Sequence, residues 1–334
     1  MNSQTDFPIS PSEITCAQER IATFVRRTPL LDYSELLVES GAKLKLKLEN
    51  LQLTGSFKIR GATNKMLTLS EDERNRGVVT VSSGNHGRAV SYAACQLGIR
   101  SVVYLPETVP PHKVSAIRDL GADVVIKGRT YDESDGYAHD YEVTQNMIFV
   151  HPFDDPAVIA GQGTIGLELL EDFPLIDTVV VPLSGGGLLS GIALALKSIN
   201  QRIRVIGVSM ERGPAMVESL KAGKVVDIVE GPTLADALMG GIGFDNRYTF
   251  QLVQQLMDEA VLVSEEDIAR AMTVALKDFH VVIEGGGAVA LAAILTNKIK
   301  SMGKNIAVII SGGNIEFPSL TQIYQENISK TAGH

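Results

Sequence analysis

The chain has 334 residues, of which 45% are hydrophobic and 21% are charged, and its formal net charge is −9. An acidic chain lacks the basic surface that displaces counterions from nucleic acid, which argues against a general nucleic-acid binder. No apolar run reaches the ~18 residues of a membrane-spanning helix. The polar N-terminus also lacks the basic-then-apolar order of a signal peptide. These features predict a cytoplasmic protein with no membrane partner.

The cysteines and histidines predict neither disulfides nor a metal site. Cys16 and Cys95 are far apart, and neither has a CxxC neighbour. The six histidines form no HExxH motif and no cluster with cysteine, and Asp154-Asp155 has the pattern of a polar turn. A disulfide framework and a zinc knuckle are therefore both disfavoured.

The first half of the chain alternates strands and helices. Residues 42–48 alternate apolar residues with lysine, as a half-exposed strand does. A helix is predicted to open near Ser56 and to run to about Leu69. From Gly77 onward, β-branched runs alternate with helical stretches that end at glycine. The predicted strands are 77–81, 100–105 and 123–126. One predicted helix is 88–97, and another is expected to end with residues 116–120, at Gly121.

A second series of the same kind begins near Ala157. Its predicted helices are 159–170 and 188–199, and its predicted strands are 178–183, 204–208 and 305–310. Strands that are apolar throughout suit parallel sheets covered by helices on both faces, so the predicted fold class is α/β. We expect a small domain at 77–150 and a large domain built from 1–76 and 151–334, with a linker at 151–156.

Three predicted strands are each followed by a Ser-Gly turn, at Ser83-Gly84, Ser184-Gly185 and Ser311-Gly312. Open α/β sheets bind ligands at the carboxyl ends of their strands, so the set indicates a ligand site, although glycine alone also permits tight turns. At 184–188, three consecutive glycines precede a predicted helix. Open backbone N–H groups at a helix N-terminus bind phosphate without Lys or Arg. Because neither a Walker loop nor GxGxxG spacing is present, a mononucleotide and a phosphorylated cofactor both remain open.

Two further groups carry candidate chemistry. Residues 82–87 place hydroxyls, an amide and an imidazole around glycines, which fits carboxylate binding and proton handling. A serine hydrolase is disfavoured because no G-x-S-x-G elbow is present. Lys58 lies among apolar residues at a predicted helix start, where desolvation lowers the pKa of an amine and favours Schiff bases. An arbitrary lysine is more often a solvated surface residue.

Four motifs, in this order, resemble those of one family: the fold-type II pyridoxal-phosphate enzymes of the threonine/serine dehydratase and serine racemase group. The motifs are SFKIRGA at 56–62, SSGNHG at 82–87, SGGGL at 184–188 and SGGN at 311–314. The resemblance covers the chain from about Thr28 to Asn314. It implies two open, mostly parallel twisted sheets flanked by helices, similar to tryptophan synthase β, with the cofactor in a cleft between two domains.

The resemblance also implies the site residues. Lys58 is similar to the lysine that forms the internal aldimine with pyridoxal 5′-phosphate, Asn85 to the residue that bonds the ring 3-hydroxyl, and Ser311 to the hydroxyl that faces the pyridine nitrogen. The implied cofactor-binding residues are Phe57, Lys58, Asn85, Gly185, Gly186, Gly187, Leu188 and Ser311. The residues implied to receive the substrate carboxylate are Ser83, Gly84, Asn85 and His86. The implied catalytic pair is Lys58 and Ser83.

The implied reaction is β-elimination from a β-hydroxy amino acid such as L-threonine or L-serine, giving a 2-oxo acid and ammonia. Lys58 would take the α-proton, and a neutral serine at the ring nitrogen would favour rapid loss of the hydroxyl. Two alternatives stay open: an amino-acid racemase in the same fold, in which Ser83 returns a proton, and a non-catalytic protein that binds a phosphometabolite. The family also implies a homodimer.

Two positions depart from the family pattern. Ser209 stands where several members have a Glu that binds a stimulatory cation, so a metal site stays open. Ala237 stands where the family has glycine, which adds a methyl group to the pocket. Residues 209–213 and 243–248 are similar to a subgroup named for hydroxyectoine utilisation, which implies a β-hydroxylated substrate derived from hydroxyectoine.

Overall fold

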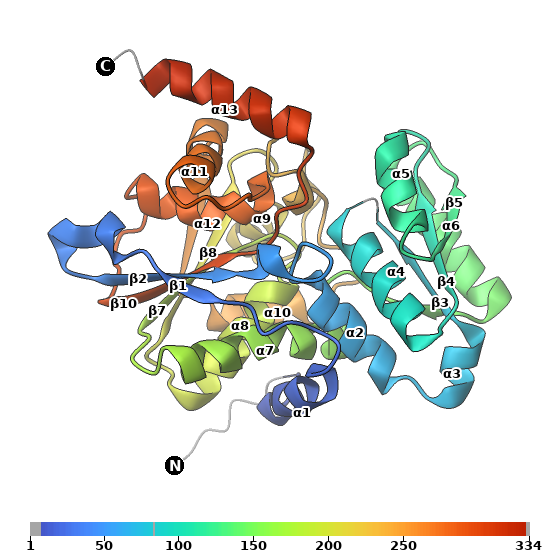
Figure 1. Cartoon of the computed structure of the whole chain (residues 1–334). Helices are drawn as coiled ribbons and strands as arrows, with labels where there is room; N and C mark the ends of the chain where they lie inside the picture. Colours follow the sequence, from blue (N-terminus) through green and yellow to red (C-terminus); the bar gives the residue numbers. More distant parts are fainter. Residues whose placement is uncertain (1–7, 83, 332–334) are drawn as a thin grey trace.

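The chain folds into two sheets flanked by helices (Figure 1). The structure is a computed structural model, and it describes residues 8–82 and 84–331. The larger sheet has the strand order β1-β2-β10-β7-β8-β9, and the smaller has the order β5-β4-β3-β6. Among the strands of the described residues, β1 and β2 alone pair antiparallel, and the other paired strands are parallel. The predicted α/β fold with two mostly parallel sheets is therefore confirmed.

The strands of the larger sheet are β1 (Leu30–Asp32), β2 (Lys43–Leu48), β7 (Thr178–Pro182), β8 (Arg204–Met210), β9 (Glu259–Val263) and β10 (Asn305–Ile310). The strands of the smaller sheet are β3 (Val78–Val81), β4 (Ser101–Leu105), β5 (Asp123–Ile126) and β6 (Ile148–Phe149).

The α-helices are α1 (Pro11–Ile21), α2 (Lys58–Thr68), α3 (Glu71–Arg76), α4 (Asn85–Leu97), α5 (Pro111–Arg118), α6 (Tyr131–Gln145), α7 (Pro156–Asp172), α8 (Gly187–Ile199), α9 (Ala215–Ala222), α10 (Thr249–Leu256), α11 (Glu265–Lys277), α12 (Gly285–Leu295) and α13 (Phe317–Thr331). The short 3₁₀ segments in the described part of the chain are η1 (Ser34–Ser40), η2 (Glu49–Leu51) and η3 (Asp236–Leu238). None of the helices in the described ranges is both long and apolar enough to cross a membrane.

Helices cover both faces of the larger sheet because its central strands are apolar on both sides. On β7, Val179 and Val181 join a core with α1, α7, α8 and α10, whereas Val180 joins a second core with α11 and α12. Successive side chains of a strand point to opposite faces, so one apolar strand supplies both cores. The same alternation occurs on β10, where Ile309 faces the first core and Val308 the second.

The smaller sheet lies beside the larger one, with its own helices around it (Figure 1). Its four strands all fall within 78–149. Helix α2 joins this part to the rest of the chain, because Ile59, Ala62 and Met66 pack in one core with Val78 and Val90. The division into domains at 77–150 stays a prediction.

Strand β2 forms where the sequence predicts a strand, but it is more buried than predicted. The lysine alternation at 42–48 predicted a half-exposed strand, and β2 does occupy Lys43–Leu48. However, β2 lies inside the sheet between β1 and β10, and its Lys47 is fully buried. The prediction of half-exposure was wrong at Lys47, because a buried carboxylate of α7 neutralises this side chain.

Candidate active site

Apart from Phe57 and Lys58, which lie at the start of α2, the described site residues predicted from the sequence lie at the carboxyl ends of β3, β7 and β10. Gly84 is the N-cap of α4, which follows β3; the triple glycine leads from β7 into α8; and Ser311 follows β10 directly. The prediction of Ser83 falls outside the described residues. β7 and β10 are neighbours in the larger sheet. Side-chain bonds from Asn85 to Glu284 and Asn314 bring the end of β3 to the same place.

Lys58 begins α2, and its amine is held by a neutral partner. The Nζ donates a hydrogen bond to the carbonyl oxygen of Pro152 at 2.6 Å and lies 5.2 Å from the centre of the Phe57 ring. Within the described residues, Lys58 forms no ion pair. Desolvation lowers the pKa of this amine to about 8. An amine with such a pKa is partly neutral near physiological pH, as a nucleophile or base requires.

The loop that holds Lys58 is fixed by two adjacent carboxylates. Asp154 accepts hydrogen bonds from the backbone N–H groups of residues 247–249 at the start of α10. Asp155 accepts from the first N–H groups of α7 and pairs with Lys65 at 2.6 Å. His151 Nδ1 accepts from the backbone N–H groups of residues 153 and 154. The predicted linker at 151–156 is thus a structured turn that caps two helices.

The glycines at 185–187 form a cradle that other residues would fill. A Cβ on Gly185 would lie 2.4 Å from the ring of Phe153, and one on Gly187 would lie 2.9 Å from the Phe153 carbonyl oxygen. Gly186 has a φ of 88°, in the left-handed region. Leu188 follows in the first turn of α8, where backbone N–H groups have no partner within the helix. Phe153 also places this cradle beside Lys58, since Pro152 precedes it.

Ser311 lies beside the segment that carries Lys58. Its carbonyl oxygen accepts a hydrogen bond from the backbone N–H of Phe57 at 3.1 Å, and Ser56 forms a β-bridge with Gly312. Within the described residues, the buried Ser311 hydroxyl makes one long contact, 3.4 Å to the Gly286 carbonyl oxygen. A neutral, weakly engaged hydroxyl at this position can bond a ring nitrogen.

His86 is a buried neutral imidazole with one nitrogen unused. Its Nε2 donates to the Val150 carbonyl oxygen at 2.9 Å, so Nδ1 is the acceptor of the ring. Nδ1 is buried and has no hydrogen-bond partner among the described residues. Desolvation, together with the positive charge of Lys58, lowers the pKa of His86 to about 3. An incoming donor would satisfy this atom.

Glu284, a buried carboxyl group at the start of α12, is a candidate functional residue that was not predicted from the sequence. Its Oε1 accepts from Asn85 Nδ2 at 2.6 Å, and desolvation raises its pKa to about 7. The signal was present in VVIEGGGAVALAAI at 281–294, where a single charged residue precedes a second triple glycine in an apolar run. A charge in such a run is costly unless it is hydrogen-bonded, so it marks a candidate functional residue.

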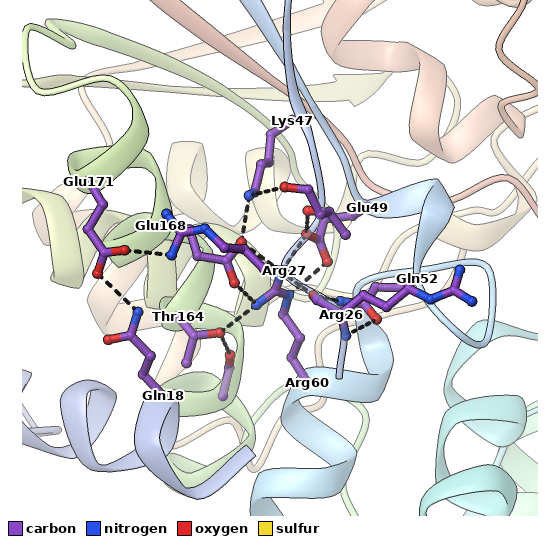
Figure 2. A network of polar contacts seen from close by, with 12 residues as sticks. Gln18, Arg26, Arg27, Lys47, Glu49, Gln52, Arg60, Thr164, Glu168 and Glu171 are labelled. Carbon is purple, nitrogen blue, oxygen red and sulfur yellow. Dashed lines mark hydrogen bonds and ion pairs between the residues drawn. The ribbon is translucent and has the colours of Figure 1, made fainter. Parts of the chain in front are cut away.

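Four buried charged side chains near the start of α2 connect β2, η2, α2 and α7 (Figure 2). Arg60 Nη1 pairs with Glu168 at 2.6 Å and Nη2 pairs with Glu49 at 2.8 Å, while Lys47 pairs with Glu168 at 2.5 Å. The two carboxylates raise the pKa of Arg60, so the group stays charged. This buried charge network fastens the first turn of α2, which carries Lys58, to the larger sheet and to α7.

Ser209 and Ala237, the two residues that depart from the family pattern, lie in different parts of the fold. Ser209 is buried in β8, and its hydroxyl contacts the Met210 sulfur at 3.5 Å. Among the described residues, no three His, Cys, Asp or Glu side chains gather as a metal-binding group. Ala237 lies against the first turn of α12, where a Cβ on Gly286 would be 3.1 Å from the Ala237 Cβ.

These residues fit pyridoxal phosphate. The glycines at 185–187 pack closely against Phe153 and carry no side chain that could cover their backbone N–H groups, and the first turn of α8 offers N–H donors to an anion. Lys58 supplies an amine of lowered pKa for the aldehyde carbon. Among the described residues, His86 Nδ1 has no hydrogen-bond partner and the Ser311 hydroxyl has one long contact, so both can form a further hydrogen bond.

Comparisons with known proteins agree with this fit. The family described as pyridoxal-phosphate dependent enzymes matches residues 21–312. The chain is 45% identical to an L-threonine ammonia-lyase of Thermotoga maritima, over 97% of this chain and 80% of that protein. It is 40% identical to a catabolic L-threonine dehydratase of Staphylococcus aureus, over 98% and 95% of the two chains. The structure of maize serine racemase superposes with a TM-score of 0.89 at 34% identity, over 98% of this chain and 100% of that one. The chain therefore belongs to the pyridoxal-phosphate dependent enzymes.

Proposed function

We propose that the protein catalyses pyridoxal-phosphate-dependent β-elimination from a β-hydroxy amino acid, with L-threonine as the first candidate substrate and L-serine as the second. The products are a 2-oxo acid and ammonia. The observation that carries the proposal is the Lys58 amine, whose pKa is about 8 and which is held beside the glycine cradle. The 45% identity to an L-threonine ammonia-lyase supports the substrate.

Bound pyridoxal phosphate supplies an electron sink that weakens the bond between the α-carbon of the amino acid and its hydrogen. Lys58 takes that proton at Nζ, because desolvation keeps its amine partly neutral. The β-hydroxyl then leaves as water, together with the proton that Lys58 Nζ took from the α-carbon. Addition of water to the released enamine yields the 2-oxo acid and ammonia. Ser311 brings no negative charge to the ring nitrogen, which favours early departure of the hydroxyl.

We infer the binding roles from the family resemblance, and the positions of the described residues support them. The N–H groups at 185–188 hold the phosphate, Phe57 lies along the ring, and the Asn85 amide bonds the ring oxygen. Gly84, Asn85 and His86, with Ser83, receive the substrate carboxylate at the N-terminus of α4. The positive end of that helix and its open N–H groups support an anion there.

The protein's assembly and surroundings are also proposals. We expect a homodimer in the cytoplasm, with the small domain at 77–150 and the remainder as the large domain. Two free cysteines, Cys16 and Cys95, fit a reducing compartment. Light scattering after size exclusion tests the dimer. A mass equal to one chain would contradict it.

The test of function begins with the visible absorption spectrum of the purified protein, with added pyridoxal phosphate where needed. L-threonine, L-serine and a β-hydroxylated amino acid derived from hydroxyectoine are then added separately, and 2-oxo acid is measured. L-alanine serves as the control, because it has no β-hydroxyl to lose. A protein that takes up no pyridoxal phosphate, or that forms no 2-oxo acid from any of the three, contradicts the proposal.

A racemase is the second candidate, favoured by the TM-score of 0.89 to maize serine racemase. It would differ in that Ser83 returns a proton to the opposite face of the α-carbon. Chiral analysis of recovered substrate separates the two reactions. D-serine accumulating faster than pyruvate from L-serine would favour the racemase.

A further inference from the structure

Glu284 is a buried carboxyl group that no step of the proposed reaction uses. It is 5% exposed and, within the described part of the chain, forms no ion pair. Each of its oxygens accepts a hydrogen bond: Oε1 from Asn85 Nδ2 at 2.6 Å, and Oε2 from the backbone N–H of Asn314 at 3.0 Å. A buried carboxylate is tolerated only when it is bonded in this way, so the arrangement is specific.

The bonds around Glu284 fix the orientation of two amide side chains. Asn314 Nδ2 donates to the Thr54 carbonyl oxygen at 2.8 Å and to Asn85 Oδ1 at 2.6 Å. A carbonyl only accepts, so the nitrogen of Asn314 must face Thr54. The oxygen of Asn85 must then face Asn314, and its nitrogen must face Glu284. If the Asn85 side-chain amide were flipped, its oxygen would face the Glu284 carboxylate, and two hydrogen-bond acceptors would be in contact.

Within the described residues, this chain of bonds leaves one hydrogen of the Asn85 amide available. Both N–H groups of the Asn314 amide are used, by Thr54 and by Asn85. The Asn85 amide has two N–H groups, and Glu284 takes one of them. Because the amide plane is fixed at both ends, the direction of the second N–H is fixed as well. Asn85 lies at the first position of α4, where the cofactor ring oxygen is expected.

We propose that Glu284 is a positioning residue, which orients Asn85 through the Asn85–Asn314 pair so that the remaining amide N–H donates to the ring oxygen of bound pyridoxal phosphate. The inference rests on the proposed function. It assigns Glu284 an effect on how tightly the cofactor is held, and no contact with the substrate.

The arrangement requires the charged form of Glu284. Both carboxylate oxygens of Glu284 accept hydrogen bonds from N–H groups. A proton on either oxygen would point at one of these N–H groups and break the hydrogen bond there. Two charged groups on other elements act on Glu284: Asp236 of η3 raises its pKa and Lys113 of α5 lowers it. These two side chains pair with each other at 3.2 Å, so their effects oppose. The orientation of Asn85 therefore weakens as the pH falls through about 7, the pKa of Glu284.

The experiment measures the dissociation constant of pyridoxal phosphate by absorbance titration from pH 6 to pH 8.5. It compares the wild type, Glu284→Gln, Asn85→Ala and the double variant. Glutamine has the shape of the protonated acid and cannot ionise. We expect Glu284→Gln to weaken binding about 10-fold to 100-fold at pH 8.5, the range for losing one bond to a charged group. The ratio of the Glu284→Gln dissociation constant to that of the wild type should fall toward 1 as the pH approaches 6. Taking this ratio cancels the pH dependence that Lys58 imposes on both proteins.

Two variants separate positioning from general loosening. Glu265→Gln is the matched control, because Glu265 also accepts one side-chain and one backbone hydrogen bond, from Thr233 and Leu234, close to α12. It should leave cofactor binding unchanged. Asn314→Ala removes the donor to Asn85 Oδ1 at an exposed position, and it should weaken binding even if Glu284→Gln fails to fold.

Glu284→Gln should add no further loss in the Asn85→Ala background, because Glu284 acts through Asn85. Full binding by the Glu284→Gln and Asn314→Ala variants would overturn the inference. So would additive losses in the double variant, or an equal loss in Glu265→Gln. A wild type that never attaches pyridoxal phosphate to Lys58 would instead overturn the proposed function, and this is visible before any variant is compared.

Discussion

The amine of Lys58 donates a hydrogen bond to the carbonyl oxygen of Pro152, 2.6 Å away, although 94 positions separate the two residues. Pro152 belongs to the turn whose aspartates cap α7 and α10. The lysine is therefore held by the backbone of a fixed turn and not by a carboxylate. This leaves its charge uncompensated and its pKa low.

Replacing Lys58 with alanine should abolish both covalent attachment of pyridoxal phosphate and formation of 2-oxo acid. No other lysine is expected to replace it, because the amine must lie beside the glycine cradle. Mass spectrometry after borohydride reduction measures the attachment. Lys65→Ala is a suitable control, since Lys65 is on the same helix but pairs with Asp155. Turnover by the Lys58→Ala variant at the wild-type rate would contradict the assignment.

Capture of pyridoxal phosphate should depend on pH through Lys58. Only the neutral amine attacks the aldehyde, and desolvation lowers the pKa of Lys58 from 10.5 to about 8. The rate constant should rise about tenfold per pH unit below pH 8 and level off above it. Stopped-flow absorbance measures this rate in the cofactor-free protein. A rate that keeps rising to pH 10 would show that Lys58 has an ordinary pKa.

Gly185→Ala should weaken cofactor binding by displacing Phe153. The new Cβ would lie 2.4 Å from the Phe153 ring, closer than any real contact, so the ring and the turn that holds Lys58 must move. We expect the affinity for pyridoxal phosphate to fall at least about tenfold, which corresponds to about 1.4 kcal/mol. Gly136→Ala in α6 is the control, because a Cβ there meets nothing within 4 Å. Equal affinities for the two variants would contradict the close packing at Gly185.

Glu168→Gln should strongly destabilise the fold. The substitution leaves Lys47 and part of Arg60 without their carboxylate in a buried place (Figure 2). Breaking a buried pair in this way typically costs about 3–5 kcal/mol. Arg27→Gln removes the ion pairs that Arg27 makes with Glu171 and Asp172 at the end of the same helix. Because these pairs are partly exposed to solvent, their loss should cost less than about 1 kcal/mol. Urea denaturation measures both, and similar losses would mean that the buried charges contribute little.

Much of the fold could be predicted from short sequence patterns that lie within a single strand, turn or helix. The β-branched runs that end at Ser-Gly turns correspond to β7 and β10, and the glycine cradle begins α8 as predicted. Helix α6 was missed because its residues, YDESDGYAHDYEVTQ, form no apolar stripe. Helix α1 was missed although Ser10 and Pro11 form a good start signal. Strand β6 has two residues, too few for any pattern.

Residues whose role depends on distant partners could not be placed in this way. Lys47 carries the alternation of an exposed strand, and only Glu168, 121 positions later, makes its burial tolerable. Glu284 depends on Asn85 across 199 positions. No periodicity contains such information, because these side chains meet only after both sheets have formed. The motif residues, in contrast, follow strand ends that the sequence marks locally.

The last strand of the chain, β10, lies in the interior of the larger sheet, between β2 and β7. During translation, β2 leaves the ribosome long before β10 exists, at ordinary rates on the order of ten seconds or more. Throughout this interval the backbone edge of β2 that will pair with β10 has no partner. The leucines of β2, which are buried in the finished fold, then lack the neighbouring strand. Such an edge is a template for aggregation. The newly made chain is therefore exposed to misassembly until its final strand is inserted, and rapid chaperone contact with the first fifty residues should raise its yield.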